Sequence, residues 1–406
     1  MKLWLAAGGV VVLLVAACGS GAPKTGAPAS TGTASGARQA SPTPVAALQP
    51  CGALPAGSPS TSGRSVILGR LSGSTSWVVR DVTDIGNPAT LASLGDKWPW
   101  ANSTSQLDAR LVDPSTVAWV DWSTQGDMVE SASSGSGLKT LVPGKSGNSI
   151  ISFAWSPMGT HWTYLVNTPS ALEWHLASGG TDRVLASLSS IPPHGGTPRL
   201  EPLMVTFSGD GTLLAMTDSA LGGGGSGDQA KMQIRRAADG SLLGTETEAG
   251  SDLLWVGSSL FYRDYNGIEV WDQSGVCSAL PGVQWIRPKL SPDGKLIVFH
   301  TEDANQLPHV FVYDLTKHKV TQVSPAGGAE AWFLSSRYVW FLEERLCATN
   351  ESCGVSNARL TGKSYIVDLV SATASQSRIT RIADTWPRPG APNFENIWWM
   401  DASAWH

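Results

Sequence analysis

Three short segments carry the residue types best suited to binding: Trp98-Pro99-Trp100, Trp285-Ile286-Arg287 and Trp386-Pro387-Arg388. Tryptophan and arginine are enriched at the energetic centres of interfaces, because each offers a large contact area and directed hydrogen-bond donors. The alternative is that these tryptophans only plug the mouth of a central channel, and most of the 18 in the chain are expected to pack in the core. The binding hypothesis predicts a surface made of Trp98, Trp100, Trp285, Arg287, Trp386 and Arg388.

The sequence shows no motif to which catalysis or metal binding can be assigned. Gly-Lys-Ser occurs at 144–146 and 362–364, but without the earlier glycine that a phosphate-binding loop requires. Neither Gly-x-Ser-x-Gly nor His-Glu-x-x-His nor Cys-x-x-Cys is present. The seven histidines are scattered. We therefore predict no catalytic residue, no metal ligand and no cofactor, which favours a non-enzyme over an enzyme without deciding between them.

The amino terminus predicts export and lipid attachment. Lys2 precedes an uncharged apolar run, Leu3 to Ala17, which has the length of a secretory signal peptide. The run ends in Val-Ala-Ala and then Cys18, which resembles the lipobox of bacterial lipoproteins. We expect residues 1–17 to be a lipoprotein signal peptide and Cys18 to be acylated, for example with palmitate. The alternative is ordinary signal cleavage beside an incidental cysteine.

Residues 18–50 predict a flexible tether. After Cys18 this segment holds only two charges, Lys24 and Arg38, among Gly, Ala, Ser, Thr and Pro. Such a composition buries too little surface to offset the entropy lost on folding. With a lipid on Cys18, the protein would be anchored to the extracytoplasmic face of the cell membrane, with residues 51–406 forming the folded domain.

The cysteines of an exported protein are expected to pair. Setting Cys18 aside, Cys347 and Cys353 flank five residues of one loop, so a local disulfide is the natural pairing. That choice leaves Cys51 to pair with Cys277, which would tie the start of the domain to a distant strand. Free buried thiols are the alternative.

One stretch, residues 284–323, gives the clearest structural pattern. Ser291-Pro292-Asp293-Gly294 predicts a turn, since proline presets φ and glycine accepts positive φ. The flanking apolar runs LIVF and VFVY predict short antiparallel strands. Similar units follow turns near 63, 113, 156, 208, 257 and 335, at a spacing of roughly 35 to 50 residues. The interpretation is an all-β β-propeller with seven four-stranded blades, although six or eight would also fit.

The Ser-Pro-Asp-Gly turn, with the strands that follow it, resembles the repeat of TolB-type propellers, a WD-like repeat. The resemblance implies a propeller fold and no particular activity. The first unit lacks a convincing innermost strand, so the sequence predicts that Ile397–Met400 completes it and closes the ring. Cys51–Leu54 is the competing segment.

Charge and motif content exclude one partner class and favour a function. The formal net charge is −5 and no basic patch occurs, so nucleic acid is not an expected partner. We expect a membrane-anchored, non-catalytic scaffold that binds a protein or a small ligand at the channel face of the propeller. Alternatives are a hydrolase or lyase with its site in the central channel, an envelope glycan binder, and a sensor or accessory subunit of an envelope complex.

Overall fold

The computed structural model describes residues 48–54, 66–71, 77–81, 89–95, 110–113, 116–121, 128–133, 137–156, 160–189, 205–217, 232–246, 252–264, 266–349, 351, 357–377 and 394–400. The chain divides into two units, Met1–Ala47 and Leu48–His406, and the described residues all belong to the second. They form strands and turns without a helix. Accordingly, no helix suited to crossing a membrane occurs among them.

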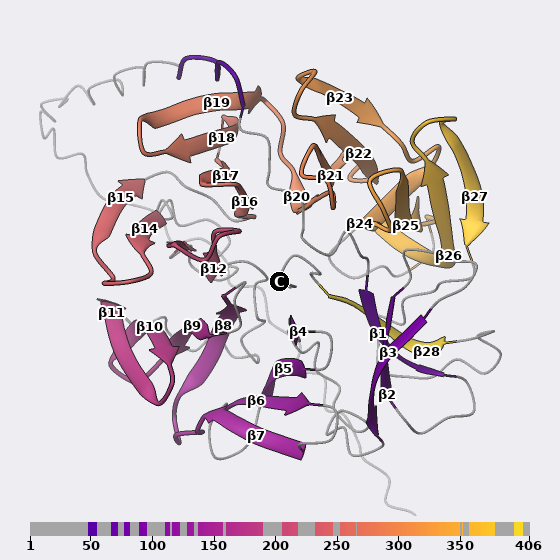
Figure 1. Ribbon diagram of the computed structural model, residues 1–406. Helices are drawn as coiled ribbons and strands as arrows, with labels where there is room; N and C mark the ends of the chain where they lie inside the picture. The colour runs from indigo at the N-terminus through magenta and orange to yellow at the C-terminus, as the bar shows by residue number, and fades with distance from the viewer. Residues whose placement is uncertain are drawn as a thin grey trace, which may run out of the picture. The chain divides into compact units, whose positions relative to one another are not determined.

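The described strands form seven antiparallel sheets of four strands each, as expected for a β-propeller (Figure 1). The first four sheets along the chain have these strands, from one edge to the other: β28 (Phe394–Met400), β1 (Val66–Leu71), β2 (Trp77–Asp81) and β3 (Ala89–Gly95); β4 (Arg110–Asp113), β5 (Thr116–Asp121), β6 (Met128–Ser133) and β7 (Gly137–Val142); β8 (Ser149–Trp155), β9 (His161–Asn167), β10 (Ala171–Ser178) and β11 (Thr181–Ser189); β12 (Val205–Phe207), β13 (Leu213–Thr217), β14 (Met232–Arg236) and β15 (Leu242–Glu246).

The remaining three sheets contain the residues that matter most below. They are β16 (Leu254–Val256), β17 (Ser259–Arg263), β18 (Gly267–Asp272) and β19 (Gly275–Pro281); β20 (Ile286–Leu290), β21 (Leu296–Glu302), β22 (Pro308–Asp314) and β23 (Lys319–Gln322); β24 (Gly327–Phe333), β25 (Tyr338–Leu346), β26 (Ala358–Asp368) and β27 (Thr373–Ser377).

A serine-based turn connects the first strand of a sheet to its second strand. In two sheets the backbone N–H of the strand's first residue, Leu213 or Leu296, donates to the serine hydroxyl five residues earlier, at 2.9 Å. That hydroxyl, of Ser208 or Ser291, donates in turn to the aspartate two residues later. The following glycines have φ of 70° and 72°, which only glycine adopts without strain. This chemistry explains why Ser-x-Asp-Gly repeats along the chain.

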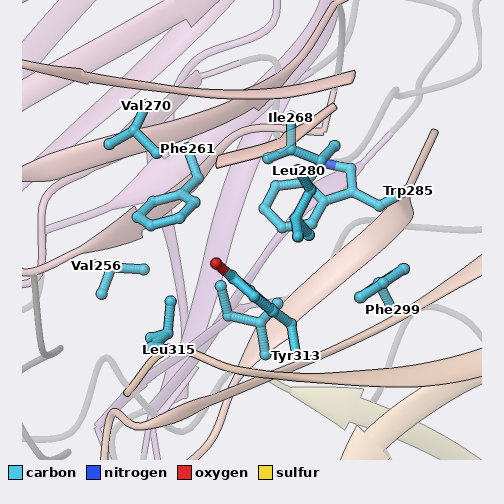
Figure 2. Close-up of a cluster of buried hydrophobic side chains, with 10 residues drawn as sticks. Val256, Phe261, Ile268, Val270, Leu280, Trp285, Phe299, Tyr313 and Leu315 are labelled. Carbon is cyan, nitrogen blue, oxygen red and sulfur yellow. The ribbon is translucent and has the colours of Figure 1, made fainter. Parts of the chain in front are cut away.

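Consecutive sheets pack face to face through apolar side chains. One core cluster joins β17 and β18 to β21 and β22, and Phe261, Phe299 and Tyr313 are among its aromatic members (Figure 2). Another joins β21 and β22 to β24 and β25 through Val298, Val310 and similar residues. Along β21, alternate residues enter different clusters, because side chains of a strand alternate between its two faces.

The last described strand completes the first sheet. β28 pairs antiparallel with β1, in register from Val66 opposite Met400 to Arg70 opposite Asn396. It therefore takes the sheet position that β4, β8 and the other first strands occupy in their own sheets. The prediction that Ile397–Met400 fills this place is confirmed by the pairing.

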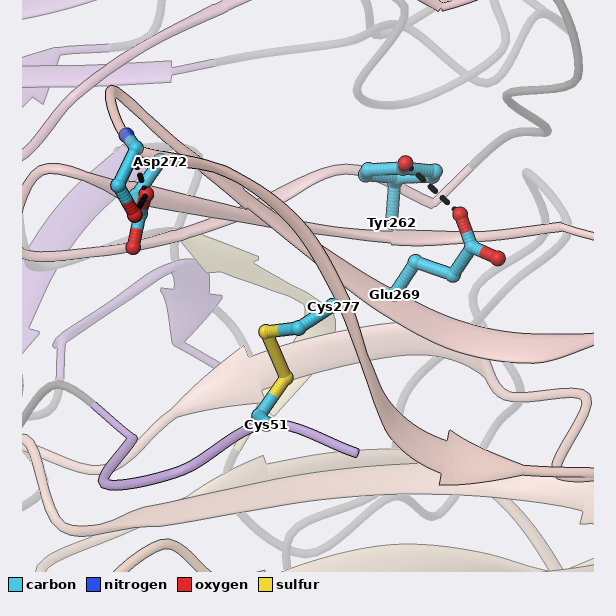
Figure 3. The surroundings of a disulfide bond; sticks show 6 residues. Cys51, Tyr262, Glu269, Asp272 and Cys277 are labelled. Carbon is cyan, nitrogen blue, oxygen red and sulfur yellow. Dashed lines mark hydrogen bonds between the residues drawn. A yellow bond between two sulfur atoms is a disulfide. The ribbon is translucent and has the colours of Figure 1, made fainter. Parts of the chain in front are cut away.

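The competing segment Cys51–Leu54 lies elsewhere. Pro50 forms a parallel bridge with Ser278 of β19, and the N–H of Cys51 donates to the carbonyl of Ser278 at 2.9 Å. A disulfide between Cys51 and Cys277 fixes this contact, with a Cα–Cα distance of 4.9 Å (Figure 3). The start of the domain is thus bonded to the outer edge of the β16–β19 sheet.

Candidate functional site

The two ends of each sheet carry different connections. We call one the connection end: it bears the segments that lead into the next sheet, such as residues 282–285, and the loops between second and third strands, such as 303–307. The opposite end, which we call the turn end, bears the short turns after first and third strands, such as 291–295 and 315–318. The predicted binding residues Trp285 and Arg287 belong to the connection end.

Four of the six predicted binding residues, Trp98, Trp100, Trp386 and Arg388, lie outside the described residues. Their part in a binding surface stays a prediction. The same holds for lipid attachment at Cys18, which also lies outside them. Cys347 is disulfide-bonded, but Cys353 is not among the described residues, so the pairing of these two also stays a prediction.

Trp285 is a core residue. Its side chain is 0% exposed, and its ring lies 6.3 Å from that of Phe261 and 5.9 Å from that of Phe299. Figure 2 shows it within the cluster between two sheets. A partner cannot contact an indole that is buried in this way. For this residue the structure therefore supports the packing alternative and not a contact with a partner.

Arg287 occupies a position that recurs in three consecutive sheets. The three first strands can be aligned by the residue that lies opposite the third residue of the second strand. That residue is Leu254, Lys289 or Trp332. Two residues before them come Asp252, Arg287 and Glu330, and all three have left-handed backbone, with φ of 66°, 51° and 54°. Residues with a Cβ adopt this region at a cost of about 1–3 kcal/mol each.

These charged residues are bonded to one another. Arg263 of β17 pairs with Asp252 at 3.2 Å and donates to the carbonyl of Trp285 at 3.2 Å. Asp252 accepts the N–H of Arg287 at 2.9 Å, and the guanidinium of Arg287 forms an ion pair with Glu330 on β24. Two ion pairs joined by one backbone hydrogen bond, from the N–H of Arg287 to Asp252, therefore cross three sheets at the connection end.

His300 lies beside these ion pairs without joining them. It pairs with Ile286 across β20 and β21 and is only 8% exposed. Among the described residues no atom hydrogen-bonds to its Nδ1. Burial, and then the positive charges of Arg287 and Arg263, lower the pKa of His300 to about 3. The ring is therefore neutral at physiological pH.

Two further carboxylates, Glu302 and Glu344, lie near enough to each other to interact electrostatically, and Glu344 also interacts with Arg287. Glu302 is the exposed last residue of β21, and Glu344 is a half-buried residue of β25. Burial raises the pKa of Glu344, the neighbouring charge of Glu302 raises it further, and Arg287 acts in the opposite direction. The described residues contain no group of three or more His, Cys, Asp or Glu that could hold a metal ion.

Most of these residues were missed by sequence reasoning, namely Asp252, Arg263, His300, Glu302, Glu330 and Glu344. The available signal was the alignment of the innermost strands, which places Asp252, Arg287 and Glu330 at one position. The repeated Trp-containing tripeptides include Arg287 but none of the acidic residues around it. The structure places two carboxylates at this inner-strand position, both engaged with arginine.

Similarity to known proteins is limited to solved structures, since neither a family model nor a curated protein matches the sequence. TolB from Acinetobacter baumannii has a TM-score of 0.42 at 14% identity, over 71% of this chain and 66% of that one. The β-propeller domain of the Trilobed protease from Pyrococcus furiosus has 0.45 at 11% identity, over 68% and 84%.

Oligogalacturonate lyase in complex with manganese has a TM-score of 0.46 at 8% identity, over 79% of this chain and 88% of that chain. By contrast, the chain spans only 34% of the tricorn protease and 66% of TolB, so it corresponds to a part of those proteins. Likeness at this level of identity concerns the fold alone, and a propeller fold hosts many activities.

Proposed function

We propose that this β-propeller is a non-catalytic binding module whose partner contacts the connection end. The observation that carries the proposal is the row of Asp252, Arg287 and Glu330, each with left-handed backbone at the same strand position. Strained backbone in charged residues concentrates at sites where a protein needs a group held in one place. Here the three residues with left-handed backbone place charged side chains at fixed positions at the connection end of three sheets.

The chemistry of the row favours binding over catalysis. A general acid or base has to exchange a proton near neutral pH. The arginines and the inner-strand carboxylates bind each other. His300 has a pKa of about 3, so at pH 7 it is a neutral imidazole and too weak a base to take up a proton. No observation on the described residues singles out the enzyme or glycan-binder alternatives.

Membrane attachment is the second part of the proposal. The Val-Ala-Ala-Cys sequence that ends at Cys18 supports lipid attachment there, and the segment between Cys18 and the domain has the composition of a flexible tether. A lipid-anchored domain would meet its partner at the extracytoplasmic face of the cell membrane. The disulfide between Cys51 and Cys277 agrees with an oxidising compartment.

The test is site-specific photo-crosslinking in cells. A photo-reactive amino acid replaces Ala304, an exposed residue of the β21–β22 loop at the connection end; the matched control replaces Gln273, an exposed residue at the turn end. We expect one discrete adduct from position 304 and none from 273, and we expect Arg287→Glu to abolish it. Equal labelling from both positions, or an adduct from 273 alone, would contradict the assignment of the connection end.

A further inference from the structure

Three polar groups at the connection end have no partner among the described residues, although their neighbours do. Glu343 accepts from Thr361 at 2.7 Å and lies 3.8 Å from the ammonium of Lys363, and Glu330 is paired with Arg287. In contrast, the carboxylates of Glu302 and Glu344 form no hydrogen bond or ion pair within the described ranges, and Nδ1 of His300 is also without one.

The three groups converge where the β20–β23 sheet meets the β24–β27 sheet. His300 and Glu302 are two residues apart on β21, so they project from the same face of that strand. Val298, two residues earlier, packs against β24 and β25, which identifies this face as the one toward the next sheet. The buried ring of His300 is therefore directed into the junction, below Glu302.

Glu344 reaches the same place from the other sheet. It pairs with Gly327 across β25 and β24. A Cβ on Gly327 would lie 2.6 Å from Cδ1 of Leu307, so the loop that follows Glu302 packs against β24 at this pair. Gly327 has no side chain, so the loop of the β20–β23 sheet can pack closely against β24. Glu302 and Glu344 lie on the two sides of this contact and interact electrostatically.

We propose that Glu302 and Glu344, with His300 beneath them, bind an arginine or lysine side chain of the protein partner. This assignment rests on the proposed binding function and names the chemistry of the contact. A cation placed between two unpaired carboxylates relieves their mutual repulsion, and the electrostatic cost is largest for Glu344 because it is half-buried.

The geometry favours an organic cation over a metal ion. No group of three His, Cys, Asp or Glu residues in the described ranges is close enough to hold a metal. A guanidinium is larger and presents five N–H donors in one plane. It can donate to both carboxylates, while the neutral imidazole of His300 can accept a further hydrogen bond. The ion pair of Arg287 with Glu330 stays intact beside it.

The experiment measures binding of a fluorescein-labelled tetra-arginine peptide to the full-length, detergent-solubilised protein, with a tetra-glutamate peptide in parallel. Glu302→Gln and Glu344→Gln preserve side-chain shape and remove one charge each. Glu343→Gln is the matched control. It removes the same charge at the position next to Glu344, from a carboxylate that already has partners.

We expect tetra-arginine to bind, and each of Glu302→Gln and Glu344→Gln to weaken it by about tenfold or more, the effect of losing a partly buried charge contact. Glu343→Gln should change it by less than about twofold, because this carboxylate is already engaged by Thr361 and Lys363. Equal affinity for all variants, absence of tetra-arginine binding, or preferential binding of tetra-glutamate each overturns the inference. If the adduct from position 304 persists in those cases, the binding module itself stands.

Discussion

At the scale of single residues, Trp285 and Arg287 lie two positions apart at the start of β20 but have different roles. The indole of Trp285 is buried between two sheets, whereas the guanidinium of Arg287 is 39% exposed and paired with Glu330. Burial of a large aromatic contributes to stability through apolar area and close packing. A half-exposed ion pair contributes little stability, so its value lies in where it places charge.

This difference predicts what Trp285→Ala does. The cavity left between the sheets should lower the free energy of unfolding by about 3–5 kcal/mol, as for other buried aromatics. Val370→Ala, at a side chain that is 77% exposed, is the control and should change it by less than about 0.5 kcal/mol. Urea denaturation followed by tryptophan fluorescence measures both. A Trp285→Ala variant as stable as the parent would mean that this core is not packed as described.

At the scale of secondary-structure elements, a polar cluster links three strands of the β8–β11 sheet. His175 of β10 approaches Asp182 of β11 at 3.0 Å and Glu173 at 3.3 Å. Tyr164 of β9 stacks on the imidazole at 4.6 Å and donates to Asp182 at 2.5 Å. Burial acts to lower the pKa of His175, but the hydrogen bonds to Asp182 and Glu173 outweigh burial, and the pKa is raised.

The raised pKa of His175 predicts a pH-dependent contribution to stability. A group whose pKa is higher in the folded state stabilises fully below its unfolded value of about 6.5, and this contribution is lost as pH rises through the folded pKa. We expect the parent protein to exceed His175→Gln in unfolding free energy by about 1–2 kcal/mol at pH 6, and the gap to shrink by pH 9.

Denaturation in urea at a series of pH values between 6 and 9 measures that gap. Asp182 carries its charge throughout this range, because His175 and Tyr164 hold its pKa below the usual value. Asp182→Asn should therefore reduce the same pH dependence and leave the part that comes from Glu173. A gap that stays constant or widens with pH would show that His175 is not held as a cation.

The sequence was enough to predict the strands and turns, but it did not predict which charged side chains come together. Ser291-Pro292-Asp293-Gly294 specifies its turn through local hydrogen bonds, so the repeat was readable from the sequence alone. The place of β28 followed from a missing innermost strand. The row of Asp252, Arg287 and Glu330 was missed because it comes from three sheets, and inserted loops of unequal length hide the shared spacing.

At the scale of the whole domain, two long-range links join the beginning of the described chain to later parts. The Cys51–Cys277 disulfide spans 226 residues, and β28 pairs with β1. The disulfide fixes a segment at an outer sheet edge, while the strand pairing supplies the innermost strand of the first sheet. Only the second link covers a backbone edge inside the fold, which would otherwise be open to pairing with other chains.

Removing β28 should therefore weaken the whole domain and not one end of it. Without residues 394–406, β1 becomes an uncovered edge strand and the first sheet loses one of its four strands. Because consecutive sheets share apolar core clusters, the loss of one strand should be felt beyond its own sheet, and we expect a single melting transition at a lower temperature, with increased aggregation. Removing residues 401–406 alone is the control, since it leaves β28 complete. Calorimetry separates the outcomes: an unchanged transition in the longer truncation would show that β28 does not contribute to the stability of the domain, whatever its pairing.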